Sequence, residues 1–190
     1  MTPRRVDLVS SNPGKLREIR EILGARGYRV RWVRATLPEL QAESLAEVVR
    51  GKLAALPPSD HPQLVEDSGL FVGSLGGFPG VYSAYAYRTL GLAAILELVG
   101  AHPRAAEFRT AAGVRVGGWS RVVEGRCPGT VADGPRGRHG FGYDPIFIPR
   151  GSDRTFGELP RREKNRLSHR ALAMQRIADL LDRRRGGRSP

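Results

Sequence analysis

The sequence contains very little cysteine and no long apolar run. Among its 190 residues only Cys127 is a cysteine, which excludes an internal disulfide and a metal site built from cysteines. No segment approaches the roughly 20 consecutive apolar residues of a membrane span. The N-terminus enters a strand-like run so early that it leaves no room for a signal peptide. We therefore expect a cytoplasmic protein that does not enter a membrane.

Three motifs that define other enzyme classes are also missing. No serine lies in a G-x-S-x-G pattern, which disfavours an α/β-hydrolase nucleophile elbow. No G-x-G-x-x-G is present, which disfavours a dinucleotide-binding fold. No histidine pattern has the spacing of a zinc site. We therefore look for chemistry in carboxylates, lysines and glycine-framed loops.

Lysine is scarce although the chain is strongly basic. The formal net charge is +12, and of the 31 basic residues only Lys15, Lys52 and Lys164 are lysines. This charge favours a polyanionic partner, and both nucleic acid and nucleotide phosphate qualify. The alternative is that most of the arginines lie on a solvated surface. Much of the excess charge lies near the C-terminus, and we interpret residues 186–190 as a basic tail.

Hydrophobic periodicity predicts an α/β fold. We expect strands over residues 6–10, 28–33 and 64–65, then antiparallel strands between 108 and 131 and a short strand at 146–148. We expect helices over 13–24, 45–56, 92–99 and 160–184. Helices alternate with strands at first, and strands then follow one another, which favours one mixed sheet flanked by helices. We interpret residues 1–185 as one domain, either undivided or split into two lobes.

The segment SSNPGK, residues 10–15, is a candidate anion site. Asn12 is a good helix N-cap and Pro13 suits the first helical position. A strand that leads into a helix leaves several backbone N–H groups unpaired at the positive end of the helix dipole. Lys15, in the first turn, reaches the same anion. The alternative is an ordinary capped helix without a ligand.

The segment VEDSG places two carboxylates side by side. Glu66 and Asp67 follow the short predicted strand, at the end of the strand where α/β sheets bind ligands. Adjacent carboxylates are costly unless a metal or a proton relieves them, and oxygen ligands favour Mg²⁺. Because neighbouring strand residues face opposite sides, we expect only one of the two to be a direct ligand. The alternative is a solvated turn.

The segment GFGYDP, residues 140–145, is a glycine-framed loop with two aromatics and one acid. Phe141 and Tyr143 can stack on a base, and Asp144 can accept a hydrogen bond from its N–H group. The alternative is a tight turn with buried aromatic rings. The loop is therefore a candidate base-binding element.

The segment EKNRLSHR, residues 163–170, lies in the predicted long helix. A turn of 100° per residue, counted from Leu167, puts Arg170 near the edge of the core stripe and His169 on the far side. An arginine at a stripe edge either has a functional partner or extends its charged end to solvent. The other three histidines lie beside Pro or Gly in loops, and we expect them on the surface.

Taken in this order, the four segments resemble the inosine triphosphatase, or Ham1-like, family of nucleoside-triphosphate pyrophosphatases. The resemblance rests on SSNPGKLREI, LPELQ, VEDSGLFV with GSLGGFPGVYS, GFGYDPIFIP, TFGEL and EKNRLSHRALA, which span nearly the whole chain. It implies an elongated α/β fold with two lobes and a nucleotide-binding groove between them. It also implies a homodimer and Mg²⁺-dependent hydrolysis of ITP, dITP and XTP to the monophosphate and pyrophosphate, which clears deaminated purines from the nucleotide pool.

The resemblance also implies roles for individual residues. Glu39 and Asp67 would hold Mg²⁺, with Asp67 also the catalytic proton acceptor and Lys15 a second catalytic residue. The residues implied to bind substrate are Ser10, Ser11, Asn12, Pro13, Gly14, Lys15, Lys52, Ser68, Phe141, Gly142, Tyr143, Asp144, Lys164, His169 and Arg170.

The bases of these substrates carry a keto acceptor at position 6, where adenine carries an amino donor. His169 and Arg170 as donors would suit the keto group and oppose the amino group. Two alternatives stay open. One is a pyrophosphatase for other modified nucleotides, such as modified pyrimidines. The other is a nucleic-acid-binding module, which rests on charge alone because the sequence has no RNA-binding or helix-turn-helix signature.

Overall fold

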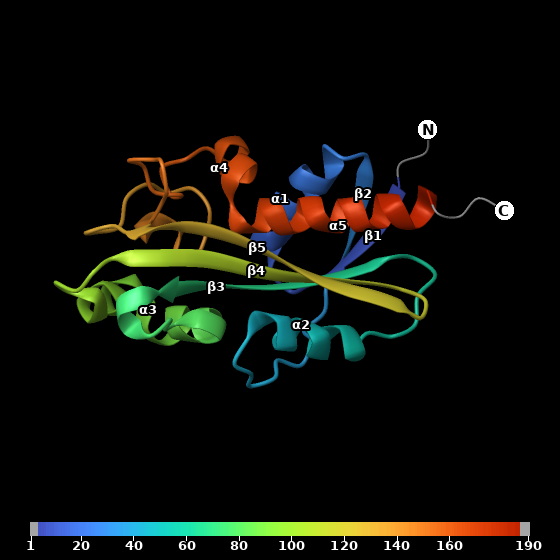
Figure 1. The fold of residues 1–190 in the computed structure, drawn as a ribbon, viewed down its shortest axis with the longest axis horizontal. Coiled ribbons are helices and arrows are strands. Elements are labelled where there is room, and N and C mark those ends of the chain that lie inside the picture. Colours follow the sequence, from blue (N-terminus) through green and yellow to red (C-terminus); the bar gives the residue numbers. More distant parts are fainter. Residues whose placement is uncertain (1–3, 187–190) are drawn as a thin grey trace. The chain divides into compact units, whose positions relative to one another are not determined.

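The computed structural model of the chain describes residues 4–186 (Figure 1). Its strands are β1 (Arg4–Val9), β2 (Tyr28–Val33), β3 (Gln63–Val72), β4 (Ala105–Val116), β5 (Trp119–Val131) and β6 (Phe147–Pro149). Its α-helices are α1 (Pro13–Gly24), α2 (Leu45–Ala54), α3 (Ser83–Val99), α4 (Arg161–Leu167) and α5 (His169–Gly186). Three short 3-10 turns are η1 (Gly73–Leu75), η2 (Gly80–Tyr82) and η3 (Asp144–Ile146). The predicted basic tail, 186–190, lies outside the described residues beyond Gly186.

The six strands form one mixed sheet in the order β2-β1-β3-β4-β5-β6. Strand β1 pairs in parallel with both β2 and β3, whereas β5 and β6 are antiparallel. The predicted mixed sheet flanked by helices is thereby confirmed. Among the described residues, no helix is both long enough and apolar enough to span a bilayer.

The chain divides into two compact units. Unit 1 contains the described residues up to Asp67, Thr110–Gly125 and the described residues from Arg170 onward. Unit 2 contains Ser68–Arg109 and Arg126–His169. Strands β3, β4 and β5 each begin in one unit and end in the other.

Helices α1 and α5 cover one face of the strands of unit 1, and α2 covers the other (Figure 1). Helix α1 begins where predicted, because the Asn12 side chain caps its first turn and Pro13 occupies its first position. Helix α2 begins with a capping box, in which the side chains of Ser44 and Glu47 each accept a hydrogen bond from the other residue's backbone N–H. The apolar stripe of α1 is buried in the core of the unit.

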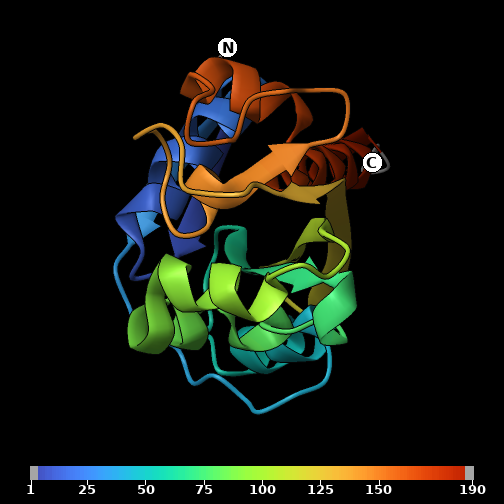
Figure 2. The same cartoon turned by 90° about the vertical axis from the view of Figure 1, so that its left-hand side faces the viewer.

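In unit 2, helices α3 and α4 lie on opposite sides of the strands (Figure 2). Gly69 explains how the chain packs beneath α3, because a Cβ atom there would lie 2.1 Å from the carbonyl oxygen of Gly80. The Ser83 hydroxyl donates to the same Gly80 oxygen and accepts from the Leu70 N–H. Only glycine leaves room for this approach.

Two predicted elements differ in extent from those observed. The strand predicted at 64–65 is the ten-residue β3, so Glu66 and Asp67 lie in the middle of a long strand and not after a short one. The helix predicted at 92–99 begins earlier, at Ser83, and is interrupted at Gly91, whose φ of 74° is not helical. The polar EDSG segment gives no strand signal in the sequence. The strand continues through it because Glu66 and Asp67 have charged partners in Lys15 and Lys52.

The long helix predicted over 160–184 is wrong, because the chain leaves helical geometry at Ser168 (φ −72°, ψ 153°) and forms α4 and α5. Serine tolerates this break since its hydroxyl offers the backbone an alternative to helical hydrogen bonds. Helical phase counted from Leu167 therefore does not continue into α5. Leu167 is 39% exposed, whereas His169, predicted on the far side, and Arg170 are each only 2% exposed.

Candidate functional site

Unit 1 contains an unbroken series of seven oppositely charged side chains, drawn from α1, α2, α5, β3 and the loop before α2. Each member lies within ion-pair distance of the next, and the series contains one more carboxylate than cations. In spatial order it consists of Glu18, Arg170, Glu66, Lys15, Asp67, Lys52 and Glu39.

The buried end of the series is the Arg170 guanidinium with two carboxylates. Its Nη1 lies 2.5 Å from Glu18 Oε2, and its Nε lies 3.6 Å from Glu66 Oε1. All three side chains are buried, and charges in this setting are stable only when paired. Arg170 therefore has its place in unit 1 fixed by α1 and β3, while His169, the preceding residue, belongs to unit 2.

Lys15 connects the two neighbouring carboxylates of β3. Its Nζ lies 2.9 Å from Glu66 Oε1 and 3.6 Å from Asp67 Oδ1. Successive strand side chains point to opposite faces, yet the Lys15 ammonium group lies within ion-pair distance of both carboxylates. Sequence reasoning named both lysine and aspartate and left the part played by Glu66 open.

At the exposed end of the series, Lys52 lies between the carboxylates of Asp67 and Glu39. Its Nζ lies 2.9 Å from Asp67 Oδ1 and 3.0 Å from Glu39 Oε1. Lys52 is 8% exposed and Glu39 is 67% exposed. Burial by itself lowers the pKa of Lys52, but the charges of Asp67 and Glu39 and their hydrogen bonds outweigh it and raise that pKa above its ordinary value. Lys52 is therefore a permanent cation at neutral pH.

Glu39 and Asp67 can share one hard cation, since both already converge on the Lys52 ammonium group. Mg²⁺ usually takes one or two protein carboxylates and completes its shell with water and substrate phosphate oxygens. Within residues 4–186 no group of three or more His, Cys, Asp or Glu side chains has an arrangement that could hold a metal by itself. The donor set thus fits a magnesium ion shared with a phosphate ligand.

The N-terminus of α1 is more fully paired than the sequence predicts. Asn12 Oδ1 accepts hydrogen bonds from the backbone N–H groups of Gly14 (2.8 Å) and Lys15 (3.2 Å). Ser10 Oγ accepts from the Asn12 N–H at 3.1 Å. The expectation of several unpaired N–H groups is thus wrong, because the cap satisfies them. Pro13 and Ser11 are exposed beside this turn, where the Ser11 hydroxyl and Lys15 remain suited to an anion.

Unit 2 contains a second lysine–carboxylate contact, framed by aromatic rings. Lys164 Nζ lies 2.6 Å from Asp144 Oδ2 and 5.3 Å from the ring centres of both Phe141 and Phe156. The same Asp144 oxygen accepts from the Phe141 N–H at 2.7 Å. A Cβ atom at Gly140 would lie 1.9 Å from that oxygen, so the first glycine of GFGYDP is required. Gly142, with a φ of 61°, allows the loop to turn.

The other residues predicted near the nucleoside differ in burial and in their contacts. Tyr143 belongs to the apolar core of unit 2, and its hydroxyl donates to the backbone oxygen of Ser83 at 2.9 Å. Burial, together with the charge of Tyr87, raises the pKa of Tyr143 to about 12. The His169 ring stacks on Phe108 with centroids 4.5 Å apart and planes 9° apart. Ser68 is half-buried on β3, at the start of unit 2.

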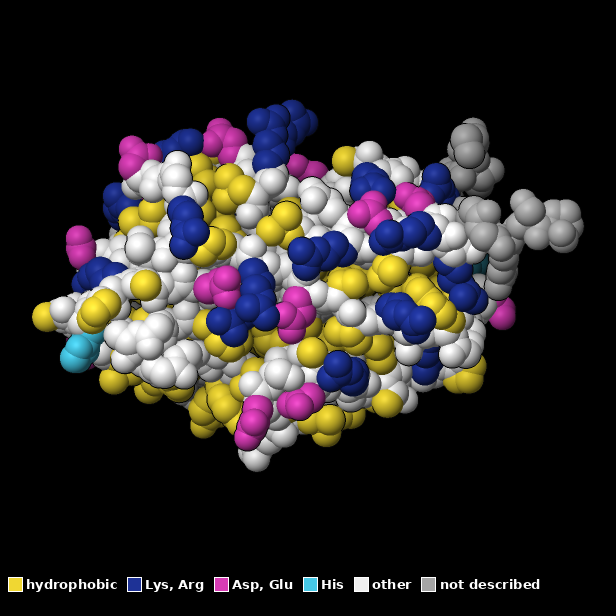
Figure 3. Space-filling view, viewed as in Figure 1, with side chains coloured by type: hydrophobic (Ala, Val, Ile, Leu, Met, Phe, Trp, Pro, Cys, Tyr) yellow, Lys and Arg dark blue, Asp and Glu magenta, His cyan; other side chains and the backbone are white. Residues whose placement is uncertain are grey.

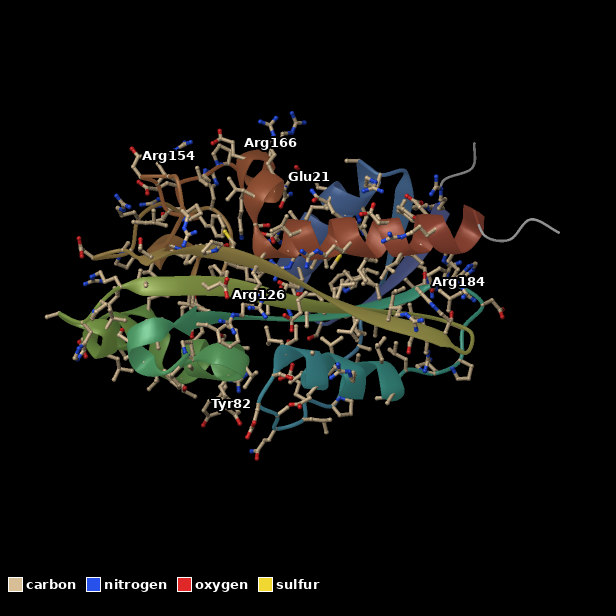
Figure 4. The ribbon with its side chains drawn as sticks, in the orientation of Figure 1. Glu21, Tyr82, Arg126, Arg154, Arg166 and Arg184 are labelled. Carbon is tan, nitrogen blue, oxygen red and sulfur yellow. The ribbon has the colours of Figure 1, made fainter. Side chains whose placement is uncertain are left out.

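Helix α4 shows why position 164 differs from its basic neighbours. Lys164 is 2% exposed and points inward, whereas Arg166 is exposed and points away from the unit (Figure 4). Arg154, also labelled there, forms a surface ion pair with Glu163 at 2.7 Å. On this helix the lysine is buried, whereas Arg161, Arg162 and Arg166 are exposed.

Sequence reasoning missed Glu18, Phe108 and Phe156 as parts of these clusters. Glu18 did carry a signal, since it is an acid inside the apolar stripe of α1 and lies three residues after Lys15. Phe108 and Phe156 carried none, because an aromatic residue in a strand or a turn is ordinarily core. Phe108 lies against His169, and Phe156 lies against Lys164, only because the fold of unit 2 brings these distant segments together.

The mixed sheet flanked by helices defines an α/β protein, and its lysine–carboxylate clusters carry cations of the kind that bind anionic ligands. The sequence model of the Ham1 family matches residues 6–180. The chain belongs to the Ham1 family.

Relatives with established names are similar over nearly the full chain. A protein named dITP/XTP pyrophosphatase from Pyrococcus horikoshii is 45% identical, covering 93% of this chain and 96% of its own length. The protein of the same name from Thermococcus kodakarensis is also 45% identical, covering 93% of this chain and 97% of its own.

Solved structures agree with the fold. A HAM1 protein from Coxiella burnetii has a TM-score of 0.80 at 27% identity, covering 95% of this chain and 99% of that one. The Staphylococcus aureus Ham1 protein has a TM-score of 0.79 at 29% identity, covering 94% and 98%. The fold described above is therefore shared with proteins of this family.

Proposed function

We propose that this protein is a nucleoside-triphosphate pyrophosphatase that hydrolyses dITP, ITP and XTP to the monophosphate and pyrophosphate. The observation that carries the proposal is the series of ion pairs in unit 1, in which two lysines meet the same aspartate, in a chain of the Ham1 family. Relatives over nearly the full chain carry the name dITP/XTP pyrophosphatase. We propose residues 1–185 as one nucleoside-triphosphate pyrophosphatase domain.

The proposed chemistry requires that a highly charged triphosphate be neutralised while water attacks it. Lys15 and Lys52 are compact cations that can exchange their carboxylate partners for phosphate oxygens. Asp67, released from the lysines, can orient or deprotonate the attacking water. We propose that Ser10 to Gly14 line the phosphates with Lys15, through the hydroxyls and the cap of α1, and that Ser68 lies beside the substrate.

We propose Mg²⁺ as the cofactor, held by Glu39 and Asp67. The support is that both carboxylates converge on one cationic group and that their oxygens suit a hard ion. When bound, magnesium would neutralise phosphate charge and favour the leaving pyrophosphate. The protein itself would place the carboxylates of Glu39 and Asp67 and hold the positively charged Lys52 beside them.

We propose that the base is read in unit 2. Phe141 supplies a ring, Gly142 the turn, Tyr143 the support beneath the loop, and Asp144 with Lys164 a fixed acceptor and donor. His169 is a donor held flat on Phe108. We also propose Arg170 as a substrate-binding residue, held in unit 1 by Glu18 and Glu66. A keto group at position 6 suits such donors, whereas an amino group does not.

We further propose a cytoplasmic homodimer. Its support is a group of exposed apolar side chains on η2 and α3, of which Tyr82 is labelled in Figure 4. These are Tyr82, Tyr85, Tyr87, Leu90 and Leu98. Surfaces of this kind are usually covered by a partner. Sedimentation equilibrium of the purified chain measures the mass, and a monomer would contradict the proposal.

A substrate panel tests the function. We expect dITP, ITP and XTP with Mg²⁺ to yield the monophosphate and pyrophosphate, and ATP and GTP to react poorly. Release of inorganic phosphate and the diphosphate would contradict a pyrophosphatase. Preference for a modified pyrimidine triphosphate would move the protein to the alternative substrate class. On the face shown in Figure 3, basic side chains are interspersed with acidic and apolar ones, which does not favour a nucleic-acid surface.

A further inference from the structure

Arg115, on β4, ties the end of α2 to the start of β3. Its Nη1 donates to the Leu53 carbonyl oxygen at 3.1 Å. Its Nη2 donates to the carbonyl oxygens of Leu56 at 2.8 Å and Pro57 at 2.5 Å, and to Gln63 Oε1 at 2.9 Å. The last carbonyls of a helix have no partner within the helix, and a cation there also suits the helix dipole. One guanidinium group therefore fixes two elements.

The two elements that Arg115 joins carry the exposed end of the ion-pair series. Lys52 directly precedes Leu53 in the last turn of α2, and Asp67 follows Gln63 by four residues along β3. The 2.9 Å contact between Lys52 Nζ and Asp67 Oδ1 depends on how these segments are placed. Arg115 itself touches neither side chain of that contact.

Gly113 fixes the depth at which α2 lies on β4. A Cβ atom at this position would lie 2.7 Å from side-chain atoms of both Val49 and Leu53, so any side chain there would displace the side chains with which α2 packs on β4. Gly113 and Arg115 lie on the same face of the strand because they are two residues apart. One face of β4 thus sets both the height of α2 and the position of its C-terminal end.

We propose that Arg115 is a positioning residue for hydrolysis, acting through Lys52. The inference rests on the proposed function, and it adds a residue that contacts neither the substrate nor the metal ligands. A lysine side chain is long and flexible, so its ammonium group is placed by the backbone that carries it. A displacement of about 1 Å at a reacting group can cost roughly 100-fold in rate.

The test begins with Arg115→Met, which removes every donor but keeps the aliphatic stem. We expect kcat for dITP to fall by roughly 10- to 100-fold, with a smaller change in KM, because placement of a charge matters most in the transition state. Arg115→Lys keeps a cation near the carbonyl oxygens, and we expect it to recover part of the lost kcat. Equal loss in both variants would overturn the role of the capping contacts.

The decisive comparison is a double-mutant cycle with Lys52→Met. If Arg115 acts through Lys52, adding Arg115→Met to Lys52→Met lowers kcat no further, although the melting temperature still falls. Multiplicative losses of kcat would overturn the proposal. The cycle is repeated with Arg115→Lys, which remains informative where Arg115→Met does not fold.

Arg104 is the matched control, because it also caps carbonyl groups at the end of a helix. It donates to the Gly100 oxygen after α3 at 3.3 Å and to the Ala132 oxygen at 2.9 Å, and it belongs to unit 2, whereas the ion-pair series belongs to unit 1. We expect Arg104→Met to lower the melting temperature and leave kcat within about twofold. A loss of kcat equal to that of Arg115→Met would overturn the specific role. An inactive wild type would overturn the proposed function as well, whereas an active wild type with multiplicative losses overturns only this inference.

Discussion

The lysines of unit 1 and the lysine of unit 2 have opposite surroundings. Lys15 and Lys52 each meet two carboxylates in a series that ends at the exposed Glu39. Lys164 meets one carboxylate, Asp144, in a buried setting between two phenylalanine rings. Contacts shared among several carboxylates at a partly exposed site favour exchange of partners, whereas a fully buried ion pair favours permanence. We infer that the lysines of unit 1 can exchange carboxylates for phosphate oxygens, whereas Lys164 and Asp144 of unit 2 form a fixed donor and acceptor.

The largest effect is expected on kcat, from a substitution at Asp67, which both lysines of unit 1 contact. Asp67→Asn keeps the shape of the side chain and removes its charge and basicity, so we expect kcat for dITP to fall by about 100- to 10,000-fold. Steady-state kinetics and circular dichroism check this together. Asp133→Asn, at an exposed carboxylate paired only with Arg104, is the matched control and should retain activity. Full activity of Asp67→Asn would remove this residue from the mechanism.

The next effect tests the permanence of the pair in unit 2. Removing one partner of a buried ion pair leaves an uncompensated charge, so Lys164→Met should lower the free energy of unfolding by about 3–5 kcal/mol. The double variant Asp144→Asn with Lys164→Met removes both charges of the pair. It should therefore be more stable than Lys164→Met alone. Urea unfolding measures both. A double variant less stable than either single one would show that the pair is not what the region depends on.

A smaller effect is expected from pH at Lys52. Its folded pKa is raised, so its contribution to stability is complete below the unfolded pKa and is lost as pH rises through the folded pKa. Melting temperatures followed upward from pH 8 should therefore fall less steeply for Lys52→Met than for the wild type once the pH exceeds 10.5, the ordinary lysine pKa. Burial raises the pKa of Cys127 to about 11, so that thiol lowers stability in the same range in both proteins. Identical slopes would contradict the contribution of Lys52.

The smallest effect is expected at Arg166, which lies two residues after the buried lysine and therefore on the opposite side of α4. Since it is exposed, Arg166→Ala should change the free energy of unfolding by no more than about 0.5 kcal/mol and leave substrate preference unchanged. The same assays used for Lys164→Met apply. A loss comparable to that of Lys164→Met would remove the contrast between lysine and arginine on this helix.

Local sequence signals predicted the elements whose stability is local. Asn12, Pro13 and the stripe from Leu16 defined α1, and alternation defined β2 over 28–33, as observed. The break at Ser168 was not predictable by periodicity, because apolar residues continue on both sides of it without Gly or Pro. The length of β3 was hidden for a related reason, since its polar middle is stable only with Lys15, Lys52 and Arg170 in place.

The sequence by itself determined which residue types are available for chemistry, the composition of the motifs and the family to which they belong. It did so because capping, alternation and short motifs depend on neighbours within a few positions. Only the tertiary structure decided that Glu18 binds Arg170, that His169 lies on Phe108, and that Arg115 holds the end of α2. These contacts join residues far apart in the chain, and their geometry is set by how helices and strands pack.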